Sequence, residues 1–531
     1  MKTFNTTGVC IPDRHYMVDL SSRMEQMKAM VDSGKYFTVN RARQYGKTTT
    51  LTALARYLEN DYAILSLDFQ GIGGSGFQSE EKFVKAFCRQ LHMKAERAGM
   101  PGKIVDEIDE YIRRREGQAA LDELFMTLAA WCQSSEKPVV MFIDEVDTAA
   151  NNQVFLDFLA QLRLQYIERE RDLNYRTFQS VVLAGVTDVK NLKWKLNPEG
   201  THKFNSPWNI AADFKIDMRL TAEGIGGMLA EYGLDHHTGM DVSVTAQEIY
   251  DYTDGYPFLV SRICQLIDEK TAGGRQPGKE GALWTQDGIS EAVGCILMEK
   301  NTLFESLMGK VHDLPELNQM LQRILFSGEM IAYNPDDAVI DEAEMYGFVK
   351  NEQGFVKVAN RIFETRLYNF FIKSYEAQYI SLCRAGTEGR SRFVKDGRLD
   401  MEGILEWYAV SFHDIYGDKY EVLDEAEGRR RFLLFLKPLI NGTGNYYIEA
   451  ETRSHERMDL VIDYLGERFV IELKIWRGGA YHQRGRRQLA GYLDACHLDR
   501  GYLLSYNFNK NKKTGLCRIQ IGGRELVEVV V

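Results

Sequence analysis

The first half of the chain alternates short apolar runs with stretches of helical spacing. The apolar runs are rich in β-branched, aliphatic and aromatic residues, and they occupy residues 36–39, 63–69, 139–143 and 178–187. Runs of this length and composition are typical of strands buried on both faces of a parallel sheet. The stretches between them, such as residues 79–133, have the apolar spacing of helices. This alternation predicts an α/β domain with a parallel sheet covered by helices.

The pattern changes from residue 214 onward. Residues 214–220 predict one more short strand, and residues 221–269 predict helices. Residues 300–375 predict three helices, a two-stranded wing and a last helix, which is the order of a winged helix. Because this region is not strongly basic, we expect it to pack or to contact a partner rather than to read DNA. Residues 384–400 are polar and contain glycines without apolar periodicity, so they predict the main linker.

The last part of the chain contains an alternating hairpin. Residues 458–464 and 467–476 alternate apolar and polar positions around a Leu465-Gly466 turn, which predicts two neighbouring antiparallel strands. Residues 484–492 predict a following helix. The patterns divide the chain into a sheet domain, a helical lid, a winged-helix-like part, a linker and a second α/β domain. We predict their bounds as 1–220, 221–299, 300–380, 381–400 and 401–531.

Composition limits the class of protein. With 531 residues the chain is too long for one hydrophobic core. Its net charge of -11 argues against nucleic-acid binding over the whole surface, although a local basic patch stays open. The eight cysteines form no C-x-x-C pair, so neither a zinc site nor a disulfide framework is indicated. No apolar run is long enough to span a membrane. We expect a protein of the reduced cytoplasm.

The turn after the first apolar run carries candidate phosphate chemistry. It reads Arg41-Ala-Arg-Gln-Tyr-Gly46-Lys47-Thr48, and a helical pattern follows. In a P-loop, backbone N–H groups face the phosphates, the lysine reaches the β- and γ-phosphates, and the hydroxyl holds Mg²⁺. Arg41 stands where the usual motif has its first glycine. A side chain there makes close backbone approach harder.

Two further strand ends complete this candidate site. The run ending in Asp144-Glu145 would place carboxylates beside the loop, since α/β sheets bind ligands at the carboxyl ends of their strands. We expect Asp144 to bind Mg²⁺ through water and Glu145 to deprotonate the attacking water. Thr187 or Asp188 would help to position that water, with a helix cap or turn residue as the alternative. The residues assigned to nucleotide binding are Arg41, Ala42, Arg43, Gln44, Tyr45, Gly46, Lys47, Thr48, Thr49, Asp144 and Thr187, with Thr48 and Asp144 as metal ligands.

The hairpin carries a second chemistry. Asp459 and Glu472 fall on neighbouring strands, and the period of two puts Lys474 on the face of Glu472. Two carboxylates with a lysine suit a Mg²⁺ site for phosphodiester hydrolysis. Gln488 on the following helix is a further catalytic candidate, and Glu427 a further metal ligand. Residues 474–518 are locally basic and would attract a phosphate backbone.

These motifs resemble a bacterial two-part family. The loop Arg41 to Thr48 is similar to the variant P-loop of AAA-like and signal-transduction (STAND-type) ATPases with numerous domains, which lessens the weight of the missing glycine. Asp459, Glu472, Lys474 and Gln488 resemble the motif of the PD-(D/E)XK nucleases, with Met458 in place of a loosely kept proline. The resemblance implies a P-loop ATPase of the additional-strand (ASCE) type joined to a nuclease-like domain. Such fusions are associated with bacterial defence and mobile elements.

Two functions follow as hypotheses. In the first, the protein binds and hydrolyses ATP with Mg²⁺, and this hydrolysis controls a Mg²⁺-dependent nuclease. The nuclease acts on nucleic acid, which we expect to be DNA. In the second, it is a nucleotide-controlled signalling or scaffold protein whose nuclease-like domain binds nucleic acid or a partner without cutting. A ring-forming homo-oligomer stays open, because one sequence identifies no arginine finger.

Overall fold

The computed structural model describes most of the chain, and the chain forms two compact units. The first unit comprises residues 1–228, 256–261 and 345–347, and the second comprises the remaining residues. The described ranges are 2–114, 119–150, 152–172, 174–186, 189, 207–273, 283–327, 329–376, 379–395, 398–417, 424–440, 444–451, 457–464, 467–495, 498–509, 512 and 514–531.

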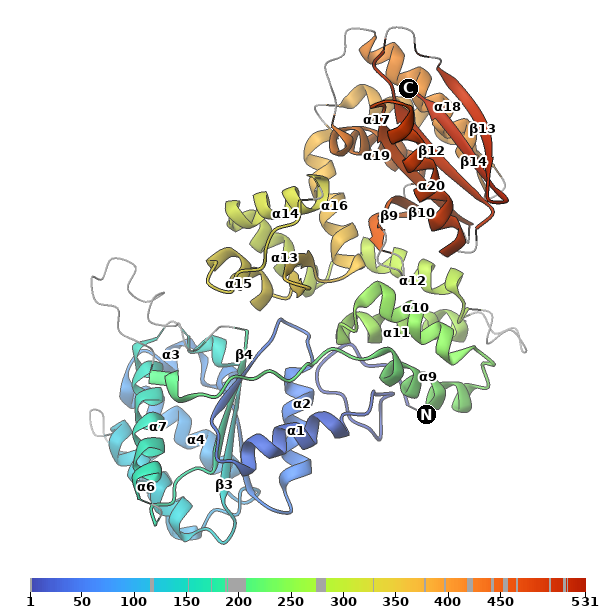
Figure 1. The fold of residues 1–531 in the computed structure, drawn as a ribbon. Coiled ribbons are helices and arrows are strands. Elements are labelled where there is room, and N and C mark those ends of the chain that lie inside the picture. The colour runs from blue at the N-terminus through green and yellow to red at the C-terminus, as the bar shows by residue number, and fades with distance from the viewer. Residues whose placement is uncertain are drawn as a thin grey trace. The chain divides into compact units, whose positions relative to one another are not determined.

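The first unit is built on a parallel sheet of four strands (Figure 1). In spatial order these are β1 (Phe37–Asn40), β4 (Ser180–Gly185), β3 (Val139–Asp144) and β2 (Ala63–Asp68). Every pair in the sheet is parallel, which agrees with the apolar runs of the sequence. Strand β4 lies between β1 and β3, as the additional strand of such ATPases should. The carboxyl ends of β1, β3 and β4 therefore meet at one edge of the sheet.

Helices cover both faces of this sheet. Helices α1 (Ser21–Asp32) and α2 (Lys47–Leu58) bury Met27, Val31 and Leu54 against one face. A larger core, dense in phenylalanine, covers the other face. The helices on that side are α4 (Glu80–Lys94), α5 (Gly102–Arg113), α6 (Leu121–Ser134) and α7 (Gln153–Arg171). Short turns of helix are η1 (Phe69–Ile72), α3 (Gly73–Gly76), η2 (Val146–Thr148) and η4 (Pro207–Ile210).

The strand predicted over residues 214–220 does not form. A single bridge pairs Ala212 with Phe37, and the chain then leaves the sheet edge. Phe214 stacks on Phe37 with ring centroids 5.9 Å apart, and Ile216 joins the same core as α1 and α2. The alternation in the sequence therefore reflects packing on the sheet face rather than pairing at its edge.

The second unit contains helical layers and a second sheet (Figure 1). The helices that lie wholly in this unit between residues 229 and 376 are α10 (Val242–Thr253), α12 (Gln286–Met298), α13 (Thr302–Asp313), α14 (Pro315–Ser327) and α16 (Arg361–Glu376). Helices α9 (Ala222–His236) and α11 (Pro257–Gly273) begin with residues of the first unit, and α15 (Ala338–Met345) ends with one. Strands β5 (Val349–Glu352) and β6 (Phe355–Val358) pair antiparallel, so the predicted two-stranded wing is present.

The C-terminal sheet mixes antiparallel and parallel pairs. Its order is β13-β14-β12-β11-β10-β9, with β9, β10 and β11 antiparallel and β11, β12 and β14 parallel. The bounds are β9 (Gly444–Glu451), β10 (Arg457–Tyr464), β11 (Glu467–Ile475), β12 (Arg500–Tyr506), β13 (Gly515–Ile521) and β14 (Arg524–Val530). The helices that accompany this sheet are α18 (Met401–Tyr416), α19 (Glu425–Ile440) and α20 (Gly479–Ala495).

The stretch predicted as a structureless linker is mostly helical. Helix α17 (Ile380–Phe393) packs along α19, and β7 (Val394–Lys395) and β8 (Arg398–Leu399) follow it. A Cβ added at Gly386 would stand 2.0 Å from the carbonyl oxygen of Phe435. The glycines that suggested a linker let two helices approach closely.

Candidate functional site

The loop between β1 and α2 has the backbone of an anion-binding turn. Gly46 caps α2 in the left-handed region at φ 79°, and Gln44 is left-handed as well at φ 57°. Glycine suits this position because it adopts positive φ without steric cost. The first turn of a helix leaves N–H groups that the helix itself does not pair, and these favour anions. The loop therefore offers backbone donors at the edge of the sheet.

Lys47 and Thr48 point into this loop from the first turn of α2. The Lys47 ammonium donates to the carbonyl oxygens of Arg41 at 2.9 Å and Ala42 at 3.0 Å. Burial lowers the pKa of Lys47, while Asp147, Glu145 and Asp144 act in the opposite direction. The Thr48 hydroxyl donates to Asp144 Oδ2 at 2.6 Å. The structure thus brings together the lysine, hydroxyl and carboxylate that the sequence predicted.

Glu145 follows the strand in a conformation that is unusual for glutamate. Its backbone lies in the left-handed region at φ 54°, and its amide donates to Asp144 Oδ1 at 2.9 Å. Such a φ at a non-glycine residue persists only where neighbouring contacts hold it. Burial, followed by the negative charge of Asp144, raises the pKa of the Glu145 carboxyl. A raised carboxyl pKa suits a group that accepts a proton during reaction.

Arg41 stands where the usual motif has a glycine, and its side chain is held by backbone carbonyl oxygens and an aromatic ring. Its guanidinium donates to the carbonyl oxygens of Asn40 at 2.7 Å and Ile216 at 3.0 Å, and it lies over the Phe214 ring. Its amide donates to the carbonyl oxygen of Gly185, on the neighbouring strand. The side chain thereby anchors the segment that was predicted as a strand.

Residues far away in the sequence also contact this loop. The Tyr256 hydroxyl donates to the Arg43 carbonyl oxygen at 2.5 Å, and the Tyr45 ring meets the Tyr256 ring edge-on. The Cys10 amide donates to Thr49 Oγ1 at 3.1 Å. No local pattern in the sequence indicates these contacts. Thr187 and Asp188, either of which was predicted to position water, lie outside the described residues.

The C-terminal candidates come together on β10 and β11. Lys474 Nζ lies 2.9 Å from Glu472 Oε1 and 3.5 Å from Asp459 Oδ2. Glu472 is fully buried, and the carboxylate forms no hydrogen bond of good geometry within the described part of the chain. Burial, and then the charge of Asp459, raises the pKa of Glu472. Asp459 also accepts from the Leu473 amide at 2.8 Å.

The helical candidates fit this cluster less well. Glu427 pairs with Arg431 one turn along α19. Among the described residues, no ion pair joins Glu427 to Lys474. Glu425 is the helix carboxylate that approaches it, with Oε2 4.0 Å from Lys474 Nζ. Arg429 lies 3.7 Å from Asp459. Gln488 is exposed and donates to the Tyr492 hydroxyl, one turn further along the same helix.

The two sites differ from a closed metal cage but suit a partly hydrated cation. Across the described residues, no group of three or more histidine, cysteine, aspartate or glutamate side chains is placed to hold a metal. Mg²⁺ does not need such a cage, because it keeps waters and combines one or two carboxylates with substrate phosphates. Thr48 with Asp144 fits that pattern. The buried carboxylate of Glu472, which pairs with Lys474 and has Asp459 nearby, fits it as well.

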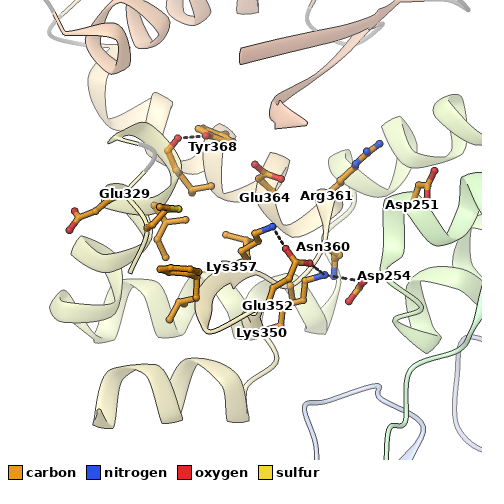
Figure 2. A pocket seen from close by; sticks show the side chains of 17 residues that line it. Asp251, Asp254, Glu329, Lys350, Glu352, Lys357, Asn360, Arg361, Glu364 and Tyr368 are labelled. Atoms are coloured by element: carbon orange, nitrogen blue, oxygen red, sulfur yellow. Dashed lines mark hydrogen bonds and ion pairs between the residues drawn. The ribbon is translucent and has the colours of Figure 1, made fainter. Parts of the chain in front are cut away.

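A polar pocket lies elsewhere in the second unit (Figure 2). It is lined by the end of α10, the wing strands and the start of α16. Its charges pair with one another: Lys350 lies 3.0 Å from Asp254, and Lys357 pairs with Glu352. None of the predicted site residues lines this pocket, and we assign it no ligand. Among the described helices, none has the length and apolarity of a membrane span.

Comparisons with known proteins bear on the ATPase part. The Walker-type ATPase of Pyrococcus abyssi is 12% identical, with a TM-score of 0.45, covering 68% of this chain and 99% of its own. The ORC2 protein of Aeropyrum pernix is 12% identical, with a TM-score of 0.40, and the match covers 68% of this chain and 94% of that protein. An uncharacterized WD repeat-containing protein of Synechocystis is 26% identical over 255 residues, which are 46% of this chain and 19% of that protein. The matched part thus spans about a fifth of that relative.

A family model described as "AAA-like domain" matches residues 9–369. That match includes the loop at Lys47, the Asp144 strand and the helices beyond them. It agrees with the parallel sheet in which β4 lies between β1 and β3. The match covers more than half of the chain, so this protein belongs to the AAA-like domain family and has the α/β fold of a P-loop ATPase.

Proposed function

We propose that the protein binds and hydrolyses ATP at the loop formed by residues 41–49. The observation that carries this proposal is the arrangement of Lys47 and Thr48. The Lys47 ammonium donates to two carbonyl oxygens of the loop, and a phosphate would compete with these oxygens for it. The Thr48 hydroxyl donates to Asp144. Thr48 and Asp144 would hold Mg²⁺, which when bound neutralises charge on the phosphates.

Glu145 is the residue that would take the proton of the attacking water. Its raised pKa and its position directly after Asp144 support this role. The left-handed backbone of Glu145 directs the residue away from the course of β3. Glutamine at this position keeps the shape of the side chain but accepts no proton, so Glu145→Gln should bind ATP and fail to turn it over.

The second part of the proposal is a phosphodiesterase at Asp459, Glu472 and Lys474. Two carboxylates on adjacent strands, with a lysine between them, are the groups that such a reaction uses. When Mg²⁺ is bound by Asp459 and Glu472, it would polarise the scissile phosphate. Lys474 would hold a water or stabilise developing charge. A role in bacterial defence or mobile elements rests on the family resemblance of both halves.

ATP would control this chemistry through helix α10. Within the second unit, the Tyr252 hydroxyl donates to Asp463 on β10 at 3.1 Å. The guanidinium of Arg468 on β11 donates to both oxygens of the same carboxylate. Four residues after Tyr252, the chain reaches Tyr256, which bonds the Arg43 carbonyl oxygen. One short segment is thus held by the ATP loop at one end and by the strands of Asp459 and Glu472 at the other.

The deciding experiment measures ATPase and nuclease activity on the same preparations of wild type, Lys47→Ala, Glu145→Gln and Lys474→Ala. We expect Lys47→Ala to lose ATP binding, and Lys474→Ala to lose cleavage while its ATPase stays unchanged. Nucleic acid that stays intact with Mg²⁺ or Mn²⁺, both with and without ATP, would disprove the nuclease. ATPase activity that survives Lys47→Ala would disprove the first part.

A second candidate is a nucleotide-controlled scaffold that binds nucleic acid or a partner without cutting. One observation favours it: among the described residues, no group of three or more histidine, cysteine, aspartate or glutamate side chains is placed to hold a metal. Titration with Mn²⁺ separates the candidates. If wild type binds Mn²⁺ and Glu472→Gln does not, the result favours the enzyme. If wild type and Glu472→Gln bind Mn²⁺ equally weakly, the result favours the scaffold.

A further inference from the structure

The basic stretch after Glu472 is less basic in three dimensions than it is in sequence. Several of its arginines are neutralised by carboxylates of the same unit. Arg486 pairs with the buried Glu528, and Arg500 and Arg518 both pair with Glu402. Arg524, just beyond the stretch, pairs with Asp494 and Asp499. These cations are therefore poorly available to an external anion.

Arg477 and Arg484 differ from that group. Both are exposed, and neither forms an ion pair with a carboxylate of the described residues. Each guanidinium lies 5.8 Å from the centroid of the Tyr481 ring. Two cations that share one ring lie at most twice that distance apart. A polyanion with closely spaced charges would meet both of them together.

Tyr481 connects these arginines to the proposed catalytic cluster. Its hydroxyl donates to Glu425 Oε1 at 3.0 Å, and the other oxygen of Glu425 lies 4.0 Å from Lys474 Nζ. One turn after Tyr481, Gly485 lies against Lys474: a Cβ added there would be 3.2 Å from Lys474 Cγ. The first turns of α20 therefore lie directly against the lysine of the cluster.

We propose that Arg477, Tyr481 and Arg484 form the surface that holds a nucleic-acid backbone against this cluster. The inference rests on the proposed nuclease-like function and names the residues that bind its substrate. The cations of the cluster are already engaged with its carboxylates, since Lys474 lies near Asp459, Glu472 and Glu425 and Arg429 lies near Asp459. The two exposed arginines supply the missing attraction where the strand must enter. An acidic protein is the alternative partner for Arg477 and Arg484. It is disfavoured because binding it would not require a cluster for phosphate chemistry beside the two arginines.

The test is the affinity of the full-length protein for a short fluorescein-labelled DNA duplex, measured by anisotropy in EDTA over a range of salt concentrations. The double variant Arg477→Gln/Arg484→Gln should bind at least about tenfold more weakly. The slope of log affinity against log salt should fall by about 1.8, or about 0.9 for each phosphate that an arginine no longer neutralises. Arg477→Lys/Arg484→Lys keeps both charges and should recover most of that slope.

Arg524→Gln is the matched control, because it removes an arginine of the same unit that is already paired. It should change affinity by less than about twofold, and thermal unfolding of all variants should stay close to that of wild type. The inference fails if wild type does not bind the duplex, if the double variant binds as wild type does, or if Arg524→Gln weakens binding equally. Absence of cleavage in every protein would remove the proposed nuclease activity and leave the binding result standing.

Discussion

Two buried lysines anchor the two candidate sites, and their surroundings act on them in opposite ways. Burial lowers the pKa of Lys47, and the nearby carboxylates only oppose that effect. Burial also disfavours the charge of Lys474, but Asp459 and Glu472 raise its pKa above the ordinary value. Lys47 thus rests on neutral carbonyl oxygens and is available to a phosphate. Lys474 is already held by carboxylates, so it suits a fixed positive charge.

The buried carboxyl of Glu472 makes stability depend on pH. Its pKa is raised in the folded state, so its favourable contribution is present below the ordinary value of 4.5 and is lost as pH rises through the folded value. Without metal, wild type should lose stability relative to Glu472→Gln from about pH 5 to about pH 8, at no more than about 1.4 kcal/mol per pH unit. Urea unfolding in EDTA measures the difference. The exposed Glu406→Gln is the control, and parallel curves for wild type and Glu472→Gln would contradict the prediction.

Arg41 allows a test of the variant loop. Its side chain binds the Ile216 carbonyl oxygen and lies over Phe214, away from the phosphate position. We expect Arg41→Ala to cost about 1 kcal/mol of stability because these interactions are removed, and to leave ATP affinity within about threefold of wild type. Thermal unfolding and titration with a fluorescent ATP analogue measure the two effects. A large loss of affinity at unchanged stability would show that the guanidinium binds nucleotide directly.

At the scale of elements, α10 is the helix on which the proposed control depends. It begins at the cap Asp241, and it carries Tyr252 at the Asp463–Arg468 pair. The left-handed Asp254 and Gly255 end the helix and turn the chain toward Tyr256. A helix moves as a rigid body over its short length, so a displacement at its end is transmitted to the hairpin that it contacts.

Tyr252→Phe removes only the hydroxyl that joins α10 to Asp463. Because Arg468 still pairs with Asp463, we expect the fold to survive with a loss of about 1 to 2 kcal/mol. ATPase activity should stay unchanged, while the ratio of cleavage with ATP to cleavage without it moves toward one. Val244→Ala, at an exposed position of the same helix, should leave that ratio as in wild type. An unaltered ratio in Tyr252→Phe would exclude this route of control.

At the scale of the whole molecule, the chain has two units, each with one candidate site. The loop of residues 41–49 belongs entirely to the first unit, and Asp459, Glu472 and Lys474 belong to the second. Residues 256–261 and 345–347 belong to the first unit although their neighbours in sequence belong to the second. The chain therefore passes between the units several times.

Separate units predict separate responses to nucleotide. A non-hydrolysable ATP analogue at about a hundred times its Kd should stabilise the first unit by about 2.7 kcal/mol. Scanning calorimetry should show one transition raised by the analogue and another that is little changed. In Lys47→Ala neither transition should move. A single transition that shifts as a whole would mean that the units unfold together.

Local patterns in the chain were sufficient to predict the four strands of the first sheet, the loop after β1 and the hairpin of β10 and β11, although they also predicted a strand over residues 214–220 that does not form. Val139–Asp144 and the turn at Gly46 depend on residues only a few positions apart, so periodicity and turn chemistry identify them. The same holds for the hairpin of Asp459 and Glu472, whose period of two places Lys474 beside Glu472.

Tertiary packing, in contrast, selects the side chains that share a site. Glu425 rather than Glu427 approaches Lys474, because two positions on a helix differ by more than half a turn and the packing of α19 fixes its rotation. Glycines that suggested a linker serve close helix packing in α17. The exposed Arg477 and Arg484 differ from their paired neighbours, because the partners of those neighbours lie on β14 and α18, far away in the chain. Local sequence holds no information about such distant contacts, and these contacts determine the final form of both sites.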